Sequence, residues 1–144
     1  MAKALTLQQL FNRVGKHLLT QLQQSTNPHE DQPGKTVCLY RNRSGLQCAI
    51  GCLIPDTHYH PGMEDRPVRS LLDDPAGPTL DAARLAHNIQ DLSRLLSSLQ
   101  TAHDGALANR RPSYYRKVWS GDLATIARRQ NLSTRWIKPL MHKE

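Results

Sequence analysis

Hydrophobic residues near the N-terminus recur at intervals of three or four positions. They are Leu7, Leu10, Phe11, Val14, Leu18, Leu19 and Leu22. This period places them on one face, so the pattern predicts an amphipathic helix over residues 6–24. Thr6 and Gln9 have the spacing of a capping box, which marks the start of a helix. The polar, proline-containing residues 25–35 then predict a loop.

Two short apolar stretches follow, separated by a turn sequence. Residues 36–41 and 46–50 have the composition of strands, and the turn between them ends on Gly45, which can adopt a left-handed conformation. The sequence therefore predicts a small β-hairpin, which must pack against helices because an isolated hairpin is marginally stable in water. Residues 56–78 are rich in proline and predict an irregular connection with one helical turn near Leu71 and Leu72.

A second long helix is predicted over residues 80–103, and Gly105 is placed to end it. Its apolar residues form a heptad-like seam: Leu85, Ile89, Leu92, Leu96 and Leu99. We interpret this seam as core packing. The alternative is a coiled-coil contact in a homodimer.

A further helix is predicted after Pro112, with Ser113 as its cap. Its apolar residues keep helical spacing: Tyr115, Val118, Trp119, Leu123 and Ile126. With the segment that follows, it forms a predicted C-terminal helical hairpin. The expected fold class is therefore α+β and mainly helical, with two long helices and this C-terminal helical hairpin packed on the small β-hairpin in a single domain of residues 1–144.

The composition fits such a fold and excludes a membrane protein. The chain has 144 residues, of which 38% are hydrophobic, and no apolar run approaches the ~18 residues of a membrane span. The N-terminal residues turn polar too early for a secretory signal, so we expect a cytoplasmic protein. The cysteines Cys38, Cys48 and Cys52 are odd in number and are expected to be reduced.

The positive charge is concentrated in the basic C-terminal segment, residues 105–144. Residues 1–104 carry ten Lys or Arg and ten acids, so the C-terminal segment supplies the whole net charge of +7. The predicted binding residues are Arg110, Arg111, Arg116, Lys117, Arg128, Arg129, Arg135 and Lys138. Nearby aromatic residues offer faces on which bases stack. This asymmetry favours a nucleic-acid or nucleoprotein partner over an acidic protein partner or a merely solvated basic face.

A helix-turn-helix is the first alternative, because residues 126–137 have its spacing. Ala127 supplies a small residue where two helices would cross, Asn131 suits the left-handed turn, and Ser133 would cap the second helix. That helix would present Thr134, Arg135 and Lys138 to a groove. Pro139 inside it argues against a DNA reader, which makes an ordinary helical hairpin with a basic surface the preferred interpretation.

The cysteines and histidines raise the question of metal chemistry. Cys38, Cys48, Cys52, His58 and His60 supply soft ligands, but their spacing is not that of common zinc fingers. We therefore expect buried thiols, no metal and no cofactor. His103 and Asp104 resemble the centre of metal-dependent phosphohydrolases, which is a second alternative. The simpler interpretation is an imidazole at a helix C-terminus, where the helix dipole favours it. Familiar phosphate-loop, hydrolase and zinc-enzyme motifs are absent from the sequence.

The segment from Cys38 to Asp56 reads CLYRNRSGLQCAIGCLIPD, and Leu99 and Gln100 precede His103 and Asp104. With the basic terminal helix, these residues resemble a group of small uncharacterised proteins carried by phages and other mobile elements. The resemblance spans most of the chain and assigns no catalytic residue. It implies a phage-type accessory protein that binds and inhibits a host machine, for example a CRISPR complex. We therefore expect a non-enzymatic binding protein.

Overall fold

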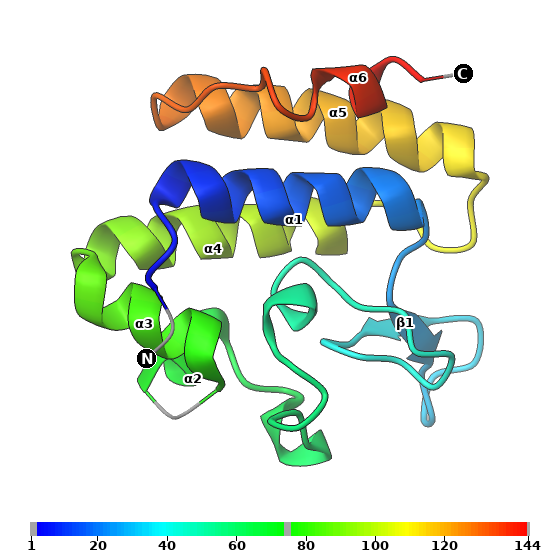
Figure 1. Ribbon diagram of the computed structural model, residues 1–144. Coiled ribbons are helices and arrows are strands. Elements are labelled where there is room, and N and C mark those ends of the chain that lie inside the picture. The colour runs from blue at the N-terminus through cyan, green and yellow to red at the C-terminus, as the bar shows by residue number, and fades with distance from the viewer. Residues whose placement is uncertain (1–2, 74–75, 144) are drawn as a thin grey trace.

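The computed structural model describes residues 3–73 and 76–143 and has the mainly helical α+β architecture that the sequence predicts. Its three longest helices are α1 (Leu7–Gln21), α4 (Ile89–Asp104) and α5 (Pro112–Arg129). In Figure 1, α1 lies beside α4 and α5, while the strands and the short helices before α4 gather below them. The other elements are β1 (Thr26–Pro28), β2 (Thr36–Cys38), the 3-10 turns η1 (Gly51–Leu53) and η2 (Pro61–Met63), α2 (Val68–Asp73), α3 (Pro78–Ala86) and α6 (Lys138–Met141).

Helix α1 confirms the first predicted helix over a shorter range. The Thr6 hydroxyl accepts a hydrogen bond from the N–H of Gln9, and the Gln9 side chain accepts one from the N–H of Thr6, so the capping box is present. The helix ends at Leu22, whose backbone is left-handed with φ 49°. The apolar stripe of α1 is buried against α4 and α5 and forms core, as its period predicts.

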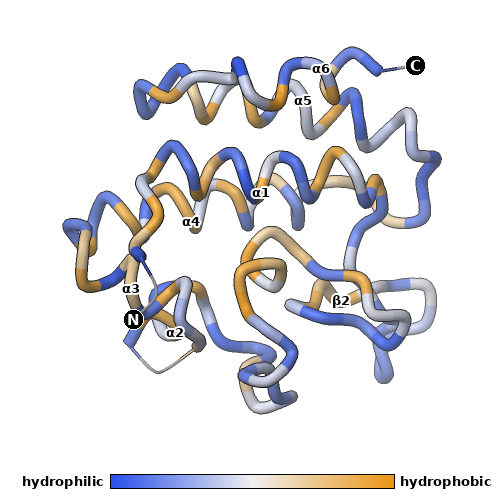
Figure 2. Tube along the Cα trace, in the orientation of Figure 1, coloured by the Kyte–Doolittle hydropathy of each residue, from blue (hydrophilic) through white to orange (hydrophobic). Residues whose placement is uncertain are grey.

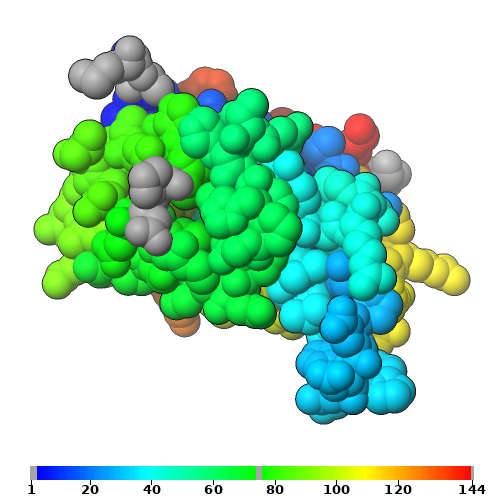
Figure 3. All heavy atoms as spheres, turned by 90° about the horizontal axis from the view of Figure 1, so that it is seen from below, coloured from blue at the N-terminus to red at the C-terminus, as the bar shows by residue number. Residues whose placement is uncertain are grey.

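The β-hairpin forms between different strands from those predicted. Strand β2 pairs antiparallel with β1, with Asn27 opposite Val37, so part of the predicted loop 25–35 is a strand. Residues 36–41 and 46–50 keep only the isolated bridge between Arg41 and Gln47 around the expected turn, in which Gly45 is left-handed with φ 83°. The hairpin projects from the molecule in Figure 3, where it is light blue.

The pairing differs because Glu64 replaces the second strand as acceptor. Its carboxylate accepts hydrogen bonds from the backbone N–H groups of Tyr40 and Arg41, at 2.9 and 3.2 Å. The N–H of Ile50 donates to the Gln100 side chain, and the chain then turns into η1. Backbone groups that the sequence assigned to a strand ladder are thus satisfied by side chains.

The predicted helix 80–103 is divided into α3 and α4. His87 and Asn88 have extended backbone at the break, and the Asn88 side chain accepts hydrogen bonds from the N–H groups of Gln90 and Asp91. Leu85 is consequently 87% exposed and does not join the seam. Leu92, Leu96 and Leu99 are fully buried within the protein, which confirms core packing for that part of the seam. Gly105 ends α4 as expected, with right-handed backbone.

Helix α5 runs unbroken through Gly121, beginning with Arg111 as its N-cap rather than the predicted Ser113. The chain then returns along α5 and α1 as irregular backbone and ends in the four-residue helix α6 (Figure 1). The irregular connection expected over residues 56–78 holds η2 and α2; of that range, residues 74–75 lie outside the described residues.

Burial follows the hydrophobic pattern of the chain. Figure 2 shows hydrophobic positions alternating with hydrophilic ones along the long helices and a continuous hydrophobic stretch around η1. The largest fully buried side chains include Trp119 and Phe11, and Tyr115 is nearly as inaccessible. Within residues 3–73 and 76–143, no helix has both the length and the apolar character needed to cross a bilayer.

Candidate nucleic-acid interface

The eight basic residues predicted to bind a partner do not form one cluster. Arg110, Arg111 and Lys117 lie at the N-terminal end of α5, whereas Arg128 and Arg129 lie in its last turn. Because a helix rises about 1.5 Å per residue, the two ends of this 18-residue helix are about 27 Å apart. The candidate interface therefore has to be judged one end at a time.

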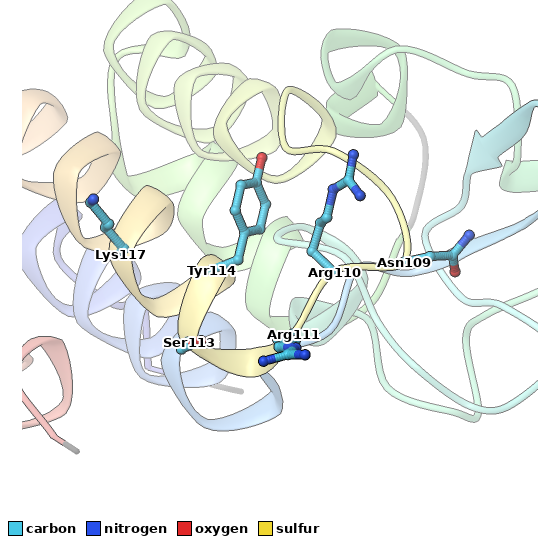
Figure 4. Close-up of a pocket in the computed structure, with 6 residues that line it drawn as sticks. All are labelled: Asn109, Arg110, Arg111, Ser113, Tyr114 and Lys117. Carbon is cyan, nitrogen blue, oxygen red and sulfur yellow. The ribbon is translucent and has the colours of Figure 1, made fainter.

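At the N-terminal end, basic residues surround an open hollow of about 550 Å³, which we call the cationic hollow. It is lined by Asn109, Arg110, Arg111, Ser113, Tyr114 and Lys117. Figure 4 shows Arg110 and Tyr114 pointing in the same direction, with Lys117 further along the helix. None of the described residues that line it is acidic, so no acidic side chain among them neutralises its three cations within the hollow. The hollow is suited to an anion.

The start of α5 adds to this positive potential. Pro112 occupies the first turn and Arg111 is the N-cap, and no side chain within residues 3–73 and 76–143 caps the helix. The N-terminus of an α-helix carries a partial positive charge and unsatisfied N–H groups, both of which favour phosphate or carboxylate. Backbone and side chains therefore both attract an anion to the start of α5.

Two tyrosines hold the loop that carries Arg110. The Tyr115 hydroxyl donates to the carbonyl oxygen of Leu107 at 2.8 Å and accepts from the N–H of Arg110 at 3.3 Å. The Tyr114 hydroxyl accepts from the N–H of Leu107 at 2.9 Å. Tyr115 is almost fully buried and its ring packs on Trp119, with centroids 4.8 Å apart. The Arg110 side chain is thus presented from a fixed backbone.

The C-terminal end of α5 is less suited to phosphate. Arg129 and Arg94 line a groove of about 640 Å³ between α4 and α5, but Asp122 lies in the same groove. Burial raises the pKa of Asp122 above its ordinary value. Arg128 and Arg129 are exposed in the last turn of α5, where the negative end of the helix dipole stabilises a positive charge. Their presence there is therefore explained by helix stability without a ligand.

The remaining predicted residues are dispersed. Arg135 lies over the ring of Trp136, with 5.2 Å between its guanidinium carbon and the ring centroid, and Trp136 is 57% exposed. Lys138 is exposed at the start of α6. Arg116 is half-buried, and its Nε is buried without a hydrogen-bond partner among the described residues. These side chains do not line the cationic hollow.

The helix-turn-helix geometry is not formed. Asn131 adopts the expected left-handed turn with φ 56°. The predicted second helix is missing, however, because residues 132–137 are irregular and α6 has only four residues. The backbone of Ser133 exchanges two hydrogen bonds with the Gln8 side chain, and Pro139 can occupy only the first turn of a helix. Thr134, Arg135 and Lys138 are therefore not aligned along a recognition helix.

His103, Asp104 and Cys38 meet between the end of α4 and the end of β2, with ligand atoms within 4.8 Å of one another. The N–H of Ser25 donates to His103 Nε2 at 2.9 Å, so that nitrogen carries no proton. The other nitrogen, Nδ1, then donates to Asp104 at 2.8 Å. A metal on Nδ1 would require loss of this proton as well, so the donor set does not suit a metal centre. The arrangement ties β2 and the segment before it to α4.

The other candidate zinc ligands do not join this cluster. Among the described residues, Cys48, Cys52, His58 and His60 belong to no group of potential ligands. The Cys48 sulfur accepts from the N–H of Gly51, and the Cys52 thiol donates to the carbonyl oxygen of Ala49. Both cysteines are thus engaged in the turn that forms η1.

The thiols are expected to react slowly in the folded protein. Burial is the main cause that raises the pKa of Cys38 and of Cys52 to about 12, from 9.0, and the charge of Asp104 also raises that of Cys38. Burial raises the pKa of Cys48 too. Since thiolate is the reactive form, its population for Cys38 and Cys52 falls about a thousandfold. Titration with DTNB at mildly alkaline pH should show slow reaction that becomes fast in guanidinium chloride; a rapidly reacting native thiol would contradict this.

Part of the lining of the cationic hollow was not predicted from the sequence, namely Asn109 and the place of Ser113 in it. Tyr114, which also lines the hollow, and Tyr115, which hydrogen-bonds to the backbone of Arg110, are among the nearby aromatic residues that we associated with base stacking from the sequence. The usable signal was Pro112, which marks the first turn of a helix and hence an N-terminus next to Arg110 and Arg111.

Fold and site together define a small, mainly helical α+β protein with an uncompensated basic hollow at one helix N-terminus. No model of a known protein family matches the chain, and no curated protein and no solved structure matches it. Function therefore has to be argued from the geometry.

Proposed function

We propose that this protein is a non-enzymatic, phage-type binding or inhibitor protein whose basic C-terminal segment engages nucleic acid or a host nucleoprotein complex, for example a CRISPR complex. The observation that carries the proposal is the cationic hollow, where Arg110, Arg111 and Lys117 surround a space with no acidic lining. A phosphodiester is the most abundant biological anion presented in repeats, and a basic segment of this size binds it by releasing counterions. The proposal places the protein in the cytoplasm, where such partners occur.

The inhibitor role rests on the resemblance to phage-type accessory proteins. A basic surface can bind a nucleoprotein complex where the phosphates of its RNA or DNA are accessible, because cations are attracted to phosphate and repelled by a protein groove that is itself positively charged. Arg128 and Arg129, exposed at the other end of α5, can add weaker phosphate contacts to the one made in the hollow. Binding to free nucleic acid and binding to such a complex thus share one chemistry, phosphate recognition by Arg and Lys.

The test is binding of labelled single-stranded DNA, duplex DNA and RNA by a variant in which the hollow is neutralised, Arg110→Gln/Arg111→Gln/Lys117→Gln. Exposed charge pairs contribute about 0.2–1 kcal/mol each, so loss of all three is expected to lower the affinity by roughly threefold to a hundredfold. Arg69→Gln is the matched control, because Arg69 is exposed on α2, away from the hollow. Fluorescence anisotropy at fixed salt measures the affinity.

The control should bind like the wild type. If the neutralised variant also binds all three nucleic acids like the wild type, the cationic hollow is not the binding site. If the wild type binds none of them, free nucleic acid is excluded as the partner.

A further inference from the structure

A second hollow of about 300 Å³ lies next to the cationic hollow, and the two share Asn109 and Arg110 in their linings. We call it the amide hollow, because Gln23, Gln24 and Asn109 are part of its wall. No acidic side chain lines it. Leu46 and Pro112 add aliphatic surface to the same wall. Its size is at the lower end for small-molecule sites, which suits a single planar group.

Gln24 exposes an unpaired acceptor to this hollow. The residue is only 6% exposed, and its Nε2 donates to two backbone carbonyl oxygens, of His103 and Ala106, both at 2.9 Å. Only the NH2 group of an amide can donate twice, so the assignment of nitrogen and oxygen is fixed. The Oε1 atom takes part in no hydrogen bond with the described residues, and it is not one of their fully buried unpaired atoms, so it remains accessible to a ligand. A buried residue that keeps a free acceptor at a hollow is suited to a ligand that brings a donor.

Two further amides are free at the rim. The side chains of Gln23 and Asn109 are exposed and take part in no hydrogen bond with the described residues. Asn109 is left-handed with φ 58°, and Figure 4 shows its side chain directed away from Lys117. Side-chain amides offer both a donor and an acceptor, the pairing that nucleobase edges require.

We infer that the amide hollow accepts one nucleobase of a single-stranded nucleic acid while the cationic hollow holds the adjoining phosphate. The inference rests on the proposed function and names its substrate class. Arg110 serves both hollows, which matches the short link between the base and the phosphate of one nucleotide. A base would place a ring N–H or exocyclic amino group on Gln24 Oε1 and its flat faces against Leu46 and Pro112. A base paired within a duplex cannot enter.

The experiment compares a short single-stranded DNA with an abasic oligonucleotide of the same length, which has the same phosphates and no bases. Anisotropy competition at fixed salt gives both affinities. Insertion of one base into the amide hollow is expected to make the affinity for the base-bearing strand about tenfold higher than that for the abasic strand. The variant Gln23→Ala/Leu46→Ala should lose most of this preference and keep the affinity for the abasic strand, because both residues line the amide hollow and neither lines the cationic hollow.

Gln90→Ala is the matched control, since Gln90 is an exposed amide in the first turn of α4, at the far end of that helix from His103. It should retain the full preference. Equal binding of the base-bearing and abasic strands by the wild type would overturn the base subsite and leave the phosphate proposal intact. Failure to bind either strand, or duplex DNA and RNA, would overturn both.

Discussion

Replacing Gly51 with alanine is expected to lower the free energy of unfolding by roughly 3 kcal/mol or more, the upper end for overpacked sites. A Cβ atom at this position would overlap the backbone carbonyl of Tyr40 well inside van der Waals contact. The clash is with backbone, so no rotamer change relieves it. Denaturant unfolding followed by circular dichroism measures the loss.

The Tyr40 backbone cannot retreat, because it is held from two sides. Its carbonyl oxygen accepts from the N–H of Cys48 at 3.2 Å, and its N–H donates to Glu64 at 2.9 Å. The Tyr40 hydroxyl also donates to the carbonyl oxygen of Arg66. Relief of the Gly51 clash would break these bonds and leave buried groups unpaired.

Gly121→Ala is the matched control. Gly121 is an exposed residue inside α5, and a Cβ atom there would meet nothing within 4 Å. Alanine at such a position is expected to stabilise the protein by about 0.5–1 kcal/mol, since it has the higher helix propensity. Equal effects of the two substitutions would show that the close approach at Gly51 is not formed.

Trp119→Ala should be at least as destabilising, by about 3–5 kcal/mol. Trp119 is completely buried, its ring stacks on His103 with 5.7 Å between centroids, and its Nε1 donates to the carbonyl oxygen of Ala102 at 3.2 Å. Truncation removes the packing surface between α4 and α5 and leaves a cavity. It also removes the support of Tyr115, so binding should weaken along with stability.

Trp136→Ala provides the comparison, because Trp136 is 57% exposed and its ring contacts the guanidinium of Arg135. Its removal should change the free energy of unfolding by no more than about 0.5 kcal/mol. Denaturation of both variants under the same conditions gives the two values. A small loss for Trp119→Ala would contradict its place in the core.

Local patterns predicted the elements whose stability is local. The period of apolar residues identified α1, and the capping box at Thr6 placed its start within one residue. Asparagine is strongly preferred at helix N-caps, so Asn88 did indicate that a helix could begin there. The seam of apolar residues continues across this position, however, and for that reason we predicted one uninterrupted helix. The strand pairing could not be derived in this way, because it depends on Glu64, which lies 24 residues beyond Tyr40 in the chain.

The sequence identified the cations of the candidate site but not the surface that they form. Charge arithmetic identified all three cations of the cationic hollow and also five residues that lie elsewhere. Charge along a sequence does not report which residues share a surface. The hollow depends on the bonds from Tyr114 and Tyr115 to Leu107 and Arg110, and the amide hollow brings Gln23 and Gln24 to residues about 85 positions away.

The salt dependence of single-stranded DNA binding tests the central claim most directly. The logarithm of the affinity should fall linearly with the logarithm of salt concentration. The slope should be shallower by about 0.7 in Arg110→Gln/Arg111→Gln/Lys117→Gln than in the wild type, since the hollow holds one phosphate and each phosphate neutralised on a single strand contributes about 0.7. An unchanged slope in that variant, with binding intact, would contradict phosphate recognition at the cationic hollow.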